Sequence, residues 1–228
     1  MGGTVQQFES DSFDTGSGAL GITFIGHGSL MFAFEGKIVH VDPYSRIGDY
    51  TSLPKADLVL ITHEHQDHFD ADALDLVRTP STALVVTQTV AGRLPGATVM
   101  HNGEKISVQG ITLEAVPAYN LVHMRSEGVA FHPKGTGNGY VVTFGGKRVY
   151  VAGDTENIPE MKELQAIDIA FLPMNLPYTM TPEMAADAAR SFQPKILYPY
   201  HFGETDPSKL VDLLKNDRGI EVRIRKMK

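Results

Sequence analysis

Cysteine is absent from this sequence of 228 residues. The chain therefore forms no disulfide bond, has no thiolate metal site and cannot use a cysteine nucleophile. Any metal site must be built from nitrogen and oxygen ligands. Because a protein without cysteine can work in any compartment, the absence does not identify a redox environment.

Long apolar runs and targeting signals are also absent. No run approaches the ~20 apolar residues that a helix needs to span a bilayer. The first residues, MGGTVQQFESDSFDTGSGALG, lack the basic and apolar regions of a signal peptide. We therefore expect a cytoplasmic protein without a membrane span.

Positive charge is in short supply, since the formal net charge is −7 and the pI is about 5.7. Such a charge argues against broad nucleic-acid binding. It leaves open a small-molecule substrate, including an anionic one, in a locally positive pocket. The sequence does not indicate an oligomeric state.

The order of predicted elements indicates one α/β domain. Residues 1–20, rich in glycine, serine and aspartate, predict a flexible N-terminal arm, and residues 21–228 predict a single domain. Strands and helices alternate through it without a stretch that resembles a linker. The segments 34–42 and 144–154 resemble one another, because each reads as a hairpin whose second strand ends in an aspartate.

Three predicted buried strands each run directly into a residue that can bind a metal. DLVLIT precedes His63, VYVAG precedes Asp154 and ILYPY precedes His201. Loops at one edge of a sheet are the usual binding place in α/β folds, and strands fix the backbone behind them. The three residues are therefore candidates for one shared site.

The stretch 63-HEHQDH-68 supplies further candidate ligands. His63 and His65 are two residues apart, so in extended backbone both face the same way and can share one metal. Asp67 and His68 can serve a second metal with the late histidine, and Asp154 can bridge the two. A histidine-rich surface turn is the alternative, but it does not predict ligands at the ends of later strands.

This ligand set predicts hydrolytic chemistry. Imidazole and carboxylate favour Zn²⁺, in one or two ions, with Mn²⁺, Fe²⁺ and Ni²⁺ as alternatives. Two metals ~3.5–4 Å apart activate a bound water and stabilise the oxyanion that its attack creates. We expect a metal-bound hydroxide to attack a carbonyl or phosphoryl centre, with Asp67 and His68 as catalytic residues.

These residues resemble the metallo-β-lactamase superfamily, whose signature His-x-His-x-Asp-His corresponds to 63-HEHQDH-68. The later Gly-Asp corresponds to 153-GD-154 and the late histidine to His201, and the opening segment 22–44 is similar as well. The branch looks like that of the ascorbate-6-phosphate lactonases and the N-acyl-phosphatidylethanolamine phospholipase D. The resemblance implies a four-layer αβ/βα sandwich of two pseudo-symmetric halves and a one- or two-metal hydrolase.

The sequence departs from that family at one ligand. The family has a further histidine on the first metal, where this chain has Asn120 in 116-VPAYN-120. His132 is our first candidate to fill the place, ahead of Asn120, and His123 is a third. If none does, the first metal site is degenerate, and a non-catalytic metal-binding or partner-binding protein becomes the alternative. A di-iron redox protein is another, although no flavin-binding domain is visible.

Two more residues have open roles. His27, between two glycines at a strand end, can line the metal cleft or serve only as a turn residue. Asp42 can accept a hydrogen bond from a ligand histidine, because metal-bound imidazoles usually have such a partner. It can equally be an ordinary opener of an Asp-Pro turn.

Overall fold

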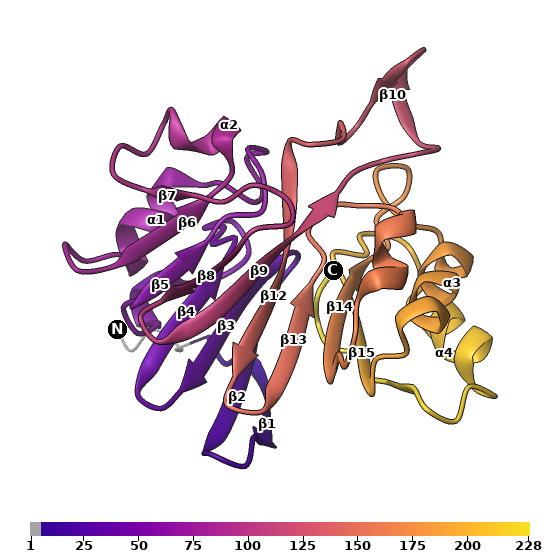
Figure 1. The fold of residues 1–228 in the computed structure, drawn as a ribbon, viewed down its shortest axis with the longest axis horizontal. Coiled ribbons are helices and arrows are strands. Elements are labelled where there is room, and N and C mark those ends of the chain that lie inside the picture. The colour runs from indigo at the N-terminus through magenta and orange to yellow at the C-terminus, as the bar shows by residue number, and fades with distance from the viewer. Residues whose placement is uncertain (1–5) are drawn as a thin grey trace.

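Two mixed β-sheets pack face to face in the computed structural model, which describes residues 6–228 (Figure 1). The first sheet has the order β1-β2-β3-β4-β5-β6-β7, with β1 (Glu9–Asp14), β2 (Ala19–Gly26), β3 (Ser29–Phe34), β4 (Lys37–Val41), β5 (Leu58–Leu60), β6 (Ala83–Val86) and β7 (Thr98–Val99). The second has the order β16-β15-β14-β13-β12-β9-β8, with β8 (Lys105–Val108), β9 (Ile111–Ala118), β12 (Gly137–Phe144), β13 (Lys147–Val151), β14 (Ile169–Pro173), β15 (Ile196–Tyr200) and β16 (Glu221–Val222).

Each sheet changes from antiparallel to parallel pairing along its width. Strands β1 to β4 pair antiparallel and β4 to β7 pair parallel. In the second sheet β8, β9, β12 and β13 pair antiparallel, and β13 to β16 pair parallel. The hairpins β3–β4 and β12–β13 occupy equivalent places, which accounts for the similarity between segments 34–42 and 144–154.

Aromatic side chains fill the space between the two sheets. Phe32 of β3 and Phe144 of β12 lie with ring centroids 5.3 Å apart, and Phe24 of β2 lies 6.2 Å from Phe171 of β14. All four are buried. Burial of such large apolar surfaces is the main force that holds the sheets together.

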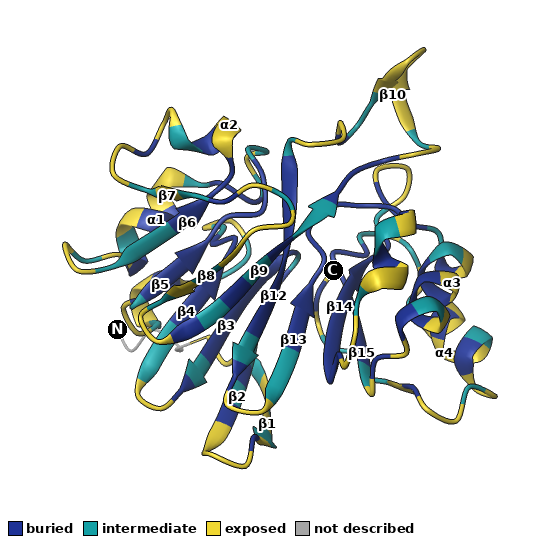
Figure 2. Ribbon diagram, in the orientation of Figure 1, coloured by how far each residue is buried: buried dark blue, intermediate teal, exposed yellow. Residues whose placement is uncertain are grey.

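Helices cover the outer face of each sheet. The helices α1 (Ala71–Val77) and α2 (Gln88–Ala91) pack on the first sheet, whereas α3 (Pro182–Phe192) and α4 (Ser208–Leu214) lie beside the second (Figure 1). Two 3₁₀ helices, η1 (Tyr50–Ser52) and η2 (Pro159–Glu163), complete the set. Figure 2 shows the sheets largely buried and the helices exposed on one side only. The predicted four-layer αβ/βα sandwich is confirmed.

The prediction of a flexible arm over residues 1–20 is wrong for residues 9–14. Glu9–Asp14 forms β1, which pairs antiparallel with β2 at the edge of the first sheet. Asp11 accepts hydrogen bonds from Tyr198 and from Arg225. An edge strand has one exposed face, so its polar residues resemble a loop in sequence. Residues 1–5 lie outside the described residues.

A long connection between β9 and β12 leaves the body of the molecule. It carries a small hairpin of β10 (Met124–Ser126) and β11 (Val129–Ala130), which projects outward (Figure 1). Within residues 6–228, no helix combines the length and the apolar character required to cross a bilayer.

Candidate metal centre

The strand ends meet as the sequence predicts. His63 follows β5, Asp154 follows β13 and His201 follows β15 directly. The Nε2 atoms of His63 and His201 lie 3.9 Å and 3.5 Å from Oδ2 of Asp154. Residues far apart in the chain thus share one site because parallel strands of both sheets end at the same side.

Three histidines form the first group of potential metal ligands. His63, His65 and His132 each offer a nitrogen, and these nitrogens all lie within 4.8 Å of one another. Nε2 of His132 is also 3.2 Å from Oδ2 of Asp154. A void of about 10 Å³ has these four residues in its wall, room for about one water-sized particle. Of the three candidates for the vacant family position, His132 is the one that lies there.

Asn120 supports His132 from behind. Its Oδ1 accepts hydrogen bonds from Nδ1 of His132 at 2.7 Å and from the backbone N–H of His132 at 2.9 Å. Its Nδ2 donates to Glu156 and to the carbonyl of Tyr178. The amide oxygen is therefore used for holding the imidazole. His123 points elsewhere, with Nδ1 2.6 Å from Oε1 of Glu156.

The Glu156 carboxylate anchors the start of the long connection. It is fully buried and accepts hydrogen bonds of 2.6–2.7 Å from the backbone N–H groups of Leu121, Val122 and His123. Burial raises the pKa of Glu156, but the hydrogen bonds from Asn120 and from those backbone groups outweigh it and lower the pKa. Glu156 could not be predicted from the sequence, because backbone N–H donors have no side-chain pattern that would identify them as its partners.

A second group contains Asp67, His68, His201 and His27, whose ligand atoms also lie within 4.8 Å of one another. Nε2 of His27 lies 3.0 Å from Oδ2 of Asp67. The rings of His27 and His201 have centroids 3.7 Å apart. His27 therefore belongs to the site, the first of the two roles open to it.

Buried hydrogen bonds fix two of the imidazoles. Nδ1 of His68 lies 2.8 Å from Oδ2 of Asp42, and Nδ1 of His63 lies 3.0 Å from Oγ1 of Thr62. Oγ1 of Thr62 donates to Asp42, so it accepts from His63. With Nδ1 protonated, Nε2 of each ring presents a lone pair to the site. Asp42 is the acceptor that the sequence suggested.

The backbone around the site is strained. His27, Asp42 and His201 have φ values of 50°, 44° and 45°, in the left-handed region that residues other than glycine seldom adopt. Such outliers cluster at functional sites. Gly28 is needed for space, since a Cβ there would lie 2.8 Å from the ring of His68.

The ligand atoms fit a divalent metal. Among the described residues, several buried polar atoms have no hydrogen-bond partner: Nε2 of His63, His68 and His201, and Oδ1 of Asp154. Leaving such atoms unpaired is costly, and a metal ion removes the cost. Two ligands of a tetrahedral Zn²⁺ are about 3.4 Å apart. The separations between Asp154 and the imidazoles of His63, His68, His132 and His201 run from 3.2 to 3.9 Å.

Burial and charged neighbours shift the pKa values of the site residues. Burial lowers the pKa of His63 and of His201, so both stay neutral at physiological pH. Burial acts the same way on His68, but the Asp154 and Asp42 carboxylates outweigh it and raise its pKa. Burial raises the pKa of Asp154, but the neighbouring imidazoles of His201, His68 and His132 outweigh it and hold that pKa well below the usual range, so the carboxylate stays ionised.

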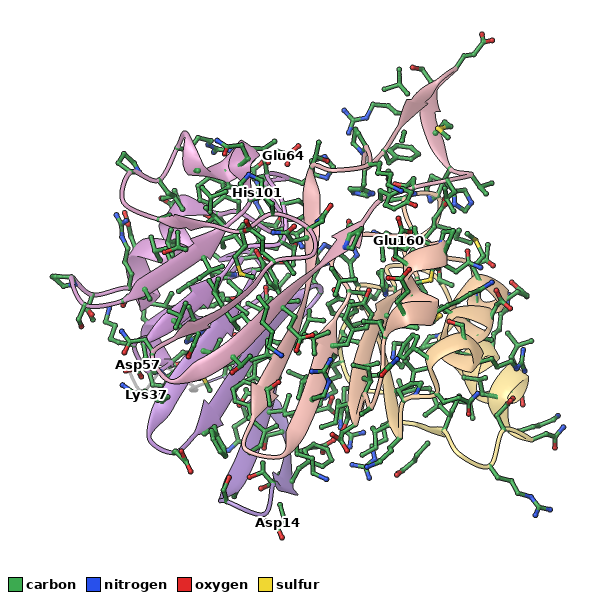
Figure 3. The ribbon with its side chains drawn as sticks, in the orientation of Figure 1. Asp14, Lys37, Asp57, Glu64, His101 and Glu160 are labelled. Carbon is green, nitrogen blue, oxygen red and sulfur yellow. The ribbon has the colours of Figure 1, made fainter. Side chains whose placement is uncertain are left out.

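Glu64 lies inside the motif but takes no part in the cluster. Its Oε2 accepts a hydrogen bond of 3.0 Å from Thr89 of α2. Figure 3 shows it beside α2. Glu64 therefore connects the motif to this helix.

Comparison with known proteins agrees with this geometry. The family described as "Beta-lactamase superfamily domain" matches residues 21–201. The chain belongs to this superfamily. The resemblance to the metallo-β-lactamase superfamily is thereby confirmed, while the branch within it stays a prediction.

The similar proteins carry hydrolase names. A UPF0173 metal-dependent hydrolase of Methanopyrus kandleri is 32% identical over 203 residues, covering 82% of this chain and 85% of that protein. A solved protein from Parabacteroides distasonis, named as a proposed metal-dependent hydrolase, is 50% identical, with a TM-score of 0.93 over 97% of this chain and 100% of that one. Igni18, a metallo hydrolase of Ignicoccus hospitalis, is 26% identical, with a TM-score of 0.75 over 91% and 95%.

Proposed function

We propose that the chain is a metal-dependent hydrolase that cleaves an ester-like or phosphodiester-like bond in a small molecule. The observation that carries the proposal is the set of buried imidazole and carboxylate atoms that face one another without partners. The names of the similar proteins support it. Zn²⁺ is the first choice of metal, because nitrogen and carboxylate ligands at these separations suit it.

The ligand roles follow from the two groups. We assign His63, His65 and His132 to a first metal position, and Asp67, His68 and His201 to a second. Asp154 lies between them, since its Oδ2 is 3.2 Å from Nε2 of His132 and 3.5 Å from Nε2 of His201, and its Oδ1 lies 3.5 Å from Nε2 of His68. A carboxylate within reach of both groups is suited to bridge them.

Asp67 is the ligand best placed to contact the attacking water. Its side chain is 36% exposed and borders the cavity above the cluster. Although burial raises the pKa of Asp67, the imidazoles of His201 and His27 hold it well below the usual range. Oδ2 is therefore ionised and can accept a hydrogen bond from the attacking water. His68 is fully buried below and serves by holding the metal position.

A metal bound here supplies an acidified water and stabilises negative charge on the substrate oxygen. In ester hydrolysis the water oxygen bonds to the acyl carbon, and the bond from that carbon to the alkoxide oxygen breaks. One water proton remains with the acid product, and the other reaches the alkoxide. Oδ2 of Asp67 orients the water by accepting a hydrogen bond from it.

Metal content and hydrolysis test the proposal together. Protein purified without chelator or affinity nickel is analysed by elemental mass spectrometry and assayed with 4-nitrophenyl acetate and bis(4-nitrophenyl) phosphate. We expect bound metal and turnover that chelation abolishes. Asp67→Ala should lose turnover while its circular dichroism spectrum stays that of the parent. Full activity in Asp67→Ala, or no metal after reconstitution with Zn²⁺, Mn²⁺, Fe²⁺ and Ni²⁺, would refute the mechanism.

A further inference from the structure

A cavity of about 500 Å³ opens directly above the metal cluster. Its lower wall contains Asp67, Asp154 and His201, which belong to the two metal groups. The opposite wall comes from two loops, with Arg125 and Phe131 from the β9–β12 connection and Tyr178 from the segment after β14. Besides the candidate ligand His132, this second wall presents side chains that are free to contact a substrate.

Arg125 is the one lysine or arginine in the wall of this cavity. It is exposed on β10, and no carboxylate among residues 6–228 pairs with it. Its Cζ lies 5.9 Å from the ring centroid of Phe131, so the ring supports the guanidinium. Five other arginines do pair with carboxylates: Arg78, Arg148, Arg190, Arg223 and Arg225. A free guanidinium in a cavity is suited to a carboxylate or phosphate.

Exposed apolar side chains are concentrated on the two loops that form this wall. The rings of Phe131 and Tyr178 meet edge to face, with centroids 5.0 Å apart. Eight large apolar residues are exposed in the described chain, and six of them lie on these two loops: Leu121, Val122, Met124, Val129, Leu176 and Tyr178. The projecting hairpin is exposed along its length (Figure 2). Apolar exposure concentrated beside a cavity marks a contact surface for an apolar ligand group.

A hydrogen bond joins the two loops at the base of the wall. Nδ2 of Asn120 donates to the carbonyl of Tyr178 at 2.8 Å. The loop that carries Tyr178 is thus tied to Asn120, which also holds His132. A ligand can contact both the cationic and the apolar groups while its reactive bond faces the cluster.

We propose that the substrate is an amphipathic organic anion. Its carboxylate or phosphate pairs with Arg125, its hydrocarbon part lies against Phe131 and Tyr178, and its scissile bond faces Asp67. This inference rests on the proposed hydrolase function for the scissile bond, whereas the recognition of the anion by Arg125 can be measured without turnover.

Binding of octanoate and acetate to the metal-loaded protein tests the recognition, by calorimetry. Arg125→Gln should weaken octanoate binding roughly 10- to 100-fold, because a charge-assisted pair is lost. Tyr178→Ser should weaken octanoate binding about tenfold, through lost apolar contact, and leave acetate binding unchanged. The matched controls Arg218→Gln and Val211→Ser alter exposed residues on the far helical side and should bind both anions like the parent.

Hydrolysis separates the two proposals. The substrates are mono-4-nitrophenyl suberate, which carries a free carboxylate, and the neutral 4-nitrophenyl octanoate. Parent protein should prefer the suberate, and Arg125→Gln should lose that preference.

Arg125-dependent octanoate binding without any hydrolysis would refute the hydrolase and keep the anion site. Hydrolysis with equal octanoate affinity in parent and Arg125→Gln would refute the anion site and keep the hydrolase. The parent protein could also bind phosphatidylglycerol vesicles while Tyr178→Ser keeps the parent's affinity for octanoate. That result would assign the apolar residues to a lipid surface and refute their contact with the hydrocarbon part of the substrate.

Discussion

The two proposed metal positions differ in how their histidines are held. In the second position, His201 follows β15 directly, and His68, in the turn after β5, is fixed by Asp42, which follows β4. In the first position, His63 follows β5 closely, but His132 comes from the long β9–β12 connection. The first position therefore takes one imidazole from this long connection, which supplies none to the second.

The buried carboxylate of Glu156 stabilises the connection that carries His132. Glu156 binds three successive backbone N–H groups at the start of the connection and also the side chain of Asn120. Asn120 in turn fixes Nδ1 of His132. The contacts from Glu156 through Asn120 to His132 thus fix a ligand imidazole in a loop, as strands fix the ligands that follow them. Position one should therefore be the more sensitive to changes in residues that touch no metal.

Asp154→Ala should have the largest effect, because this carboxylate adjoins both groups. We expect both metals to be lost and hydrolysis to fall to the background rate. Elemental analysis after dialysis measures the loss, and Asp212→Ala, at an exposed aspartate, is the control. Retention of both metals in Asp154→Ala would remove the bridging role.

His132→Ala and His201→Ala should each remove one metal and leave the other. We expect about one metal per chain in each variant, against about two in the parent, since each variant keeps the intact ligand set of one position. The double variant should bind none. If His132→Ala alone released both metals, the positions would fill only together and the comparison above would fail.

Asn120→Ala should weaken the first position and spare the second. Loss of an acceptor behind a ligand imidazole typically costs about 10- to 100-fold in metal affinity. Asn120→Asp retains an oxygen acceptor for His132 but sets a second carboxylate against the buried Glu156, so it should weaken the first position as well. Competition with a chromophoric chelator resolves the two affinities. Equal weakening of both positions in Asn120→Ala would point to general destabilisation and away from a specific support of His132.

The second position was the easier of the two to predict from sequence. His201 follows an apolar run, and His68 belongs to a six-residue motif, so each was named as a ligand without an alternative. The third ligand of the first position was left open among three residues. Which of the three residues reaches the metal position depends on side-chain directions within an irregular loop, where no periodicity relates sequence to orientation.

Two other features escaped prediction for related reasons. Glu156 has most of its partners in backbone groups more than thirty residues earlier, which carry no side-chain signature. Strand β1 was mistaken for an arm because its residues alternate between exposed and half-buried, with Phe13 as their one large apolar side chain. Asp11 of this strand contacts Tyr198 and Arg225, which lie 187 and 214 residues later in the sequence. Local patterns predict elements and their ends, whereas such contacts depend on the completed fold.

Lys134→Met should have the smallest effect on metal binding of all these variants. Nζ of Lys134 lies 2.7 Å from Oε1 of Glu160, which Figure 3 shows on η2, and contacts Tyr119 as well. This pair lies two residues beyond His132 but is exposed, and exposed ion pairs add little to stability. We expect unchanged metal content and unchanged chelator competition. A selective loss of the first metal would show that the loop is fixed at both ends, and that its support extends beyond Glu156 and Asn120.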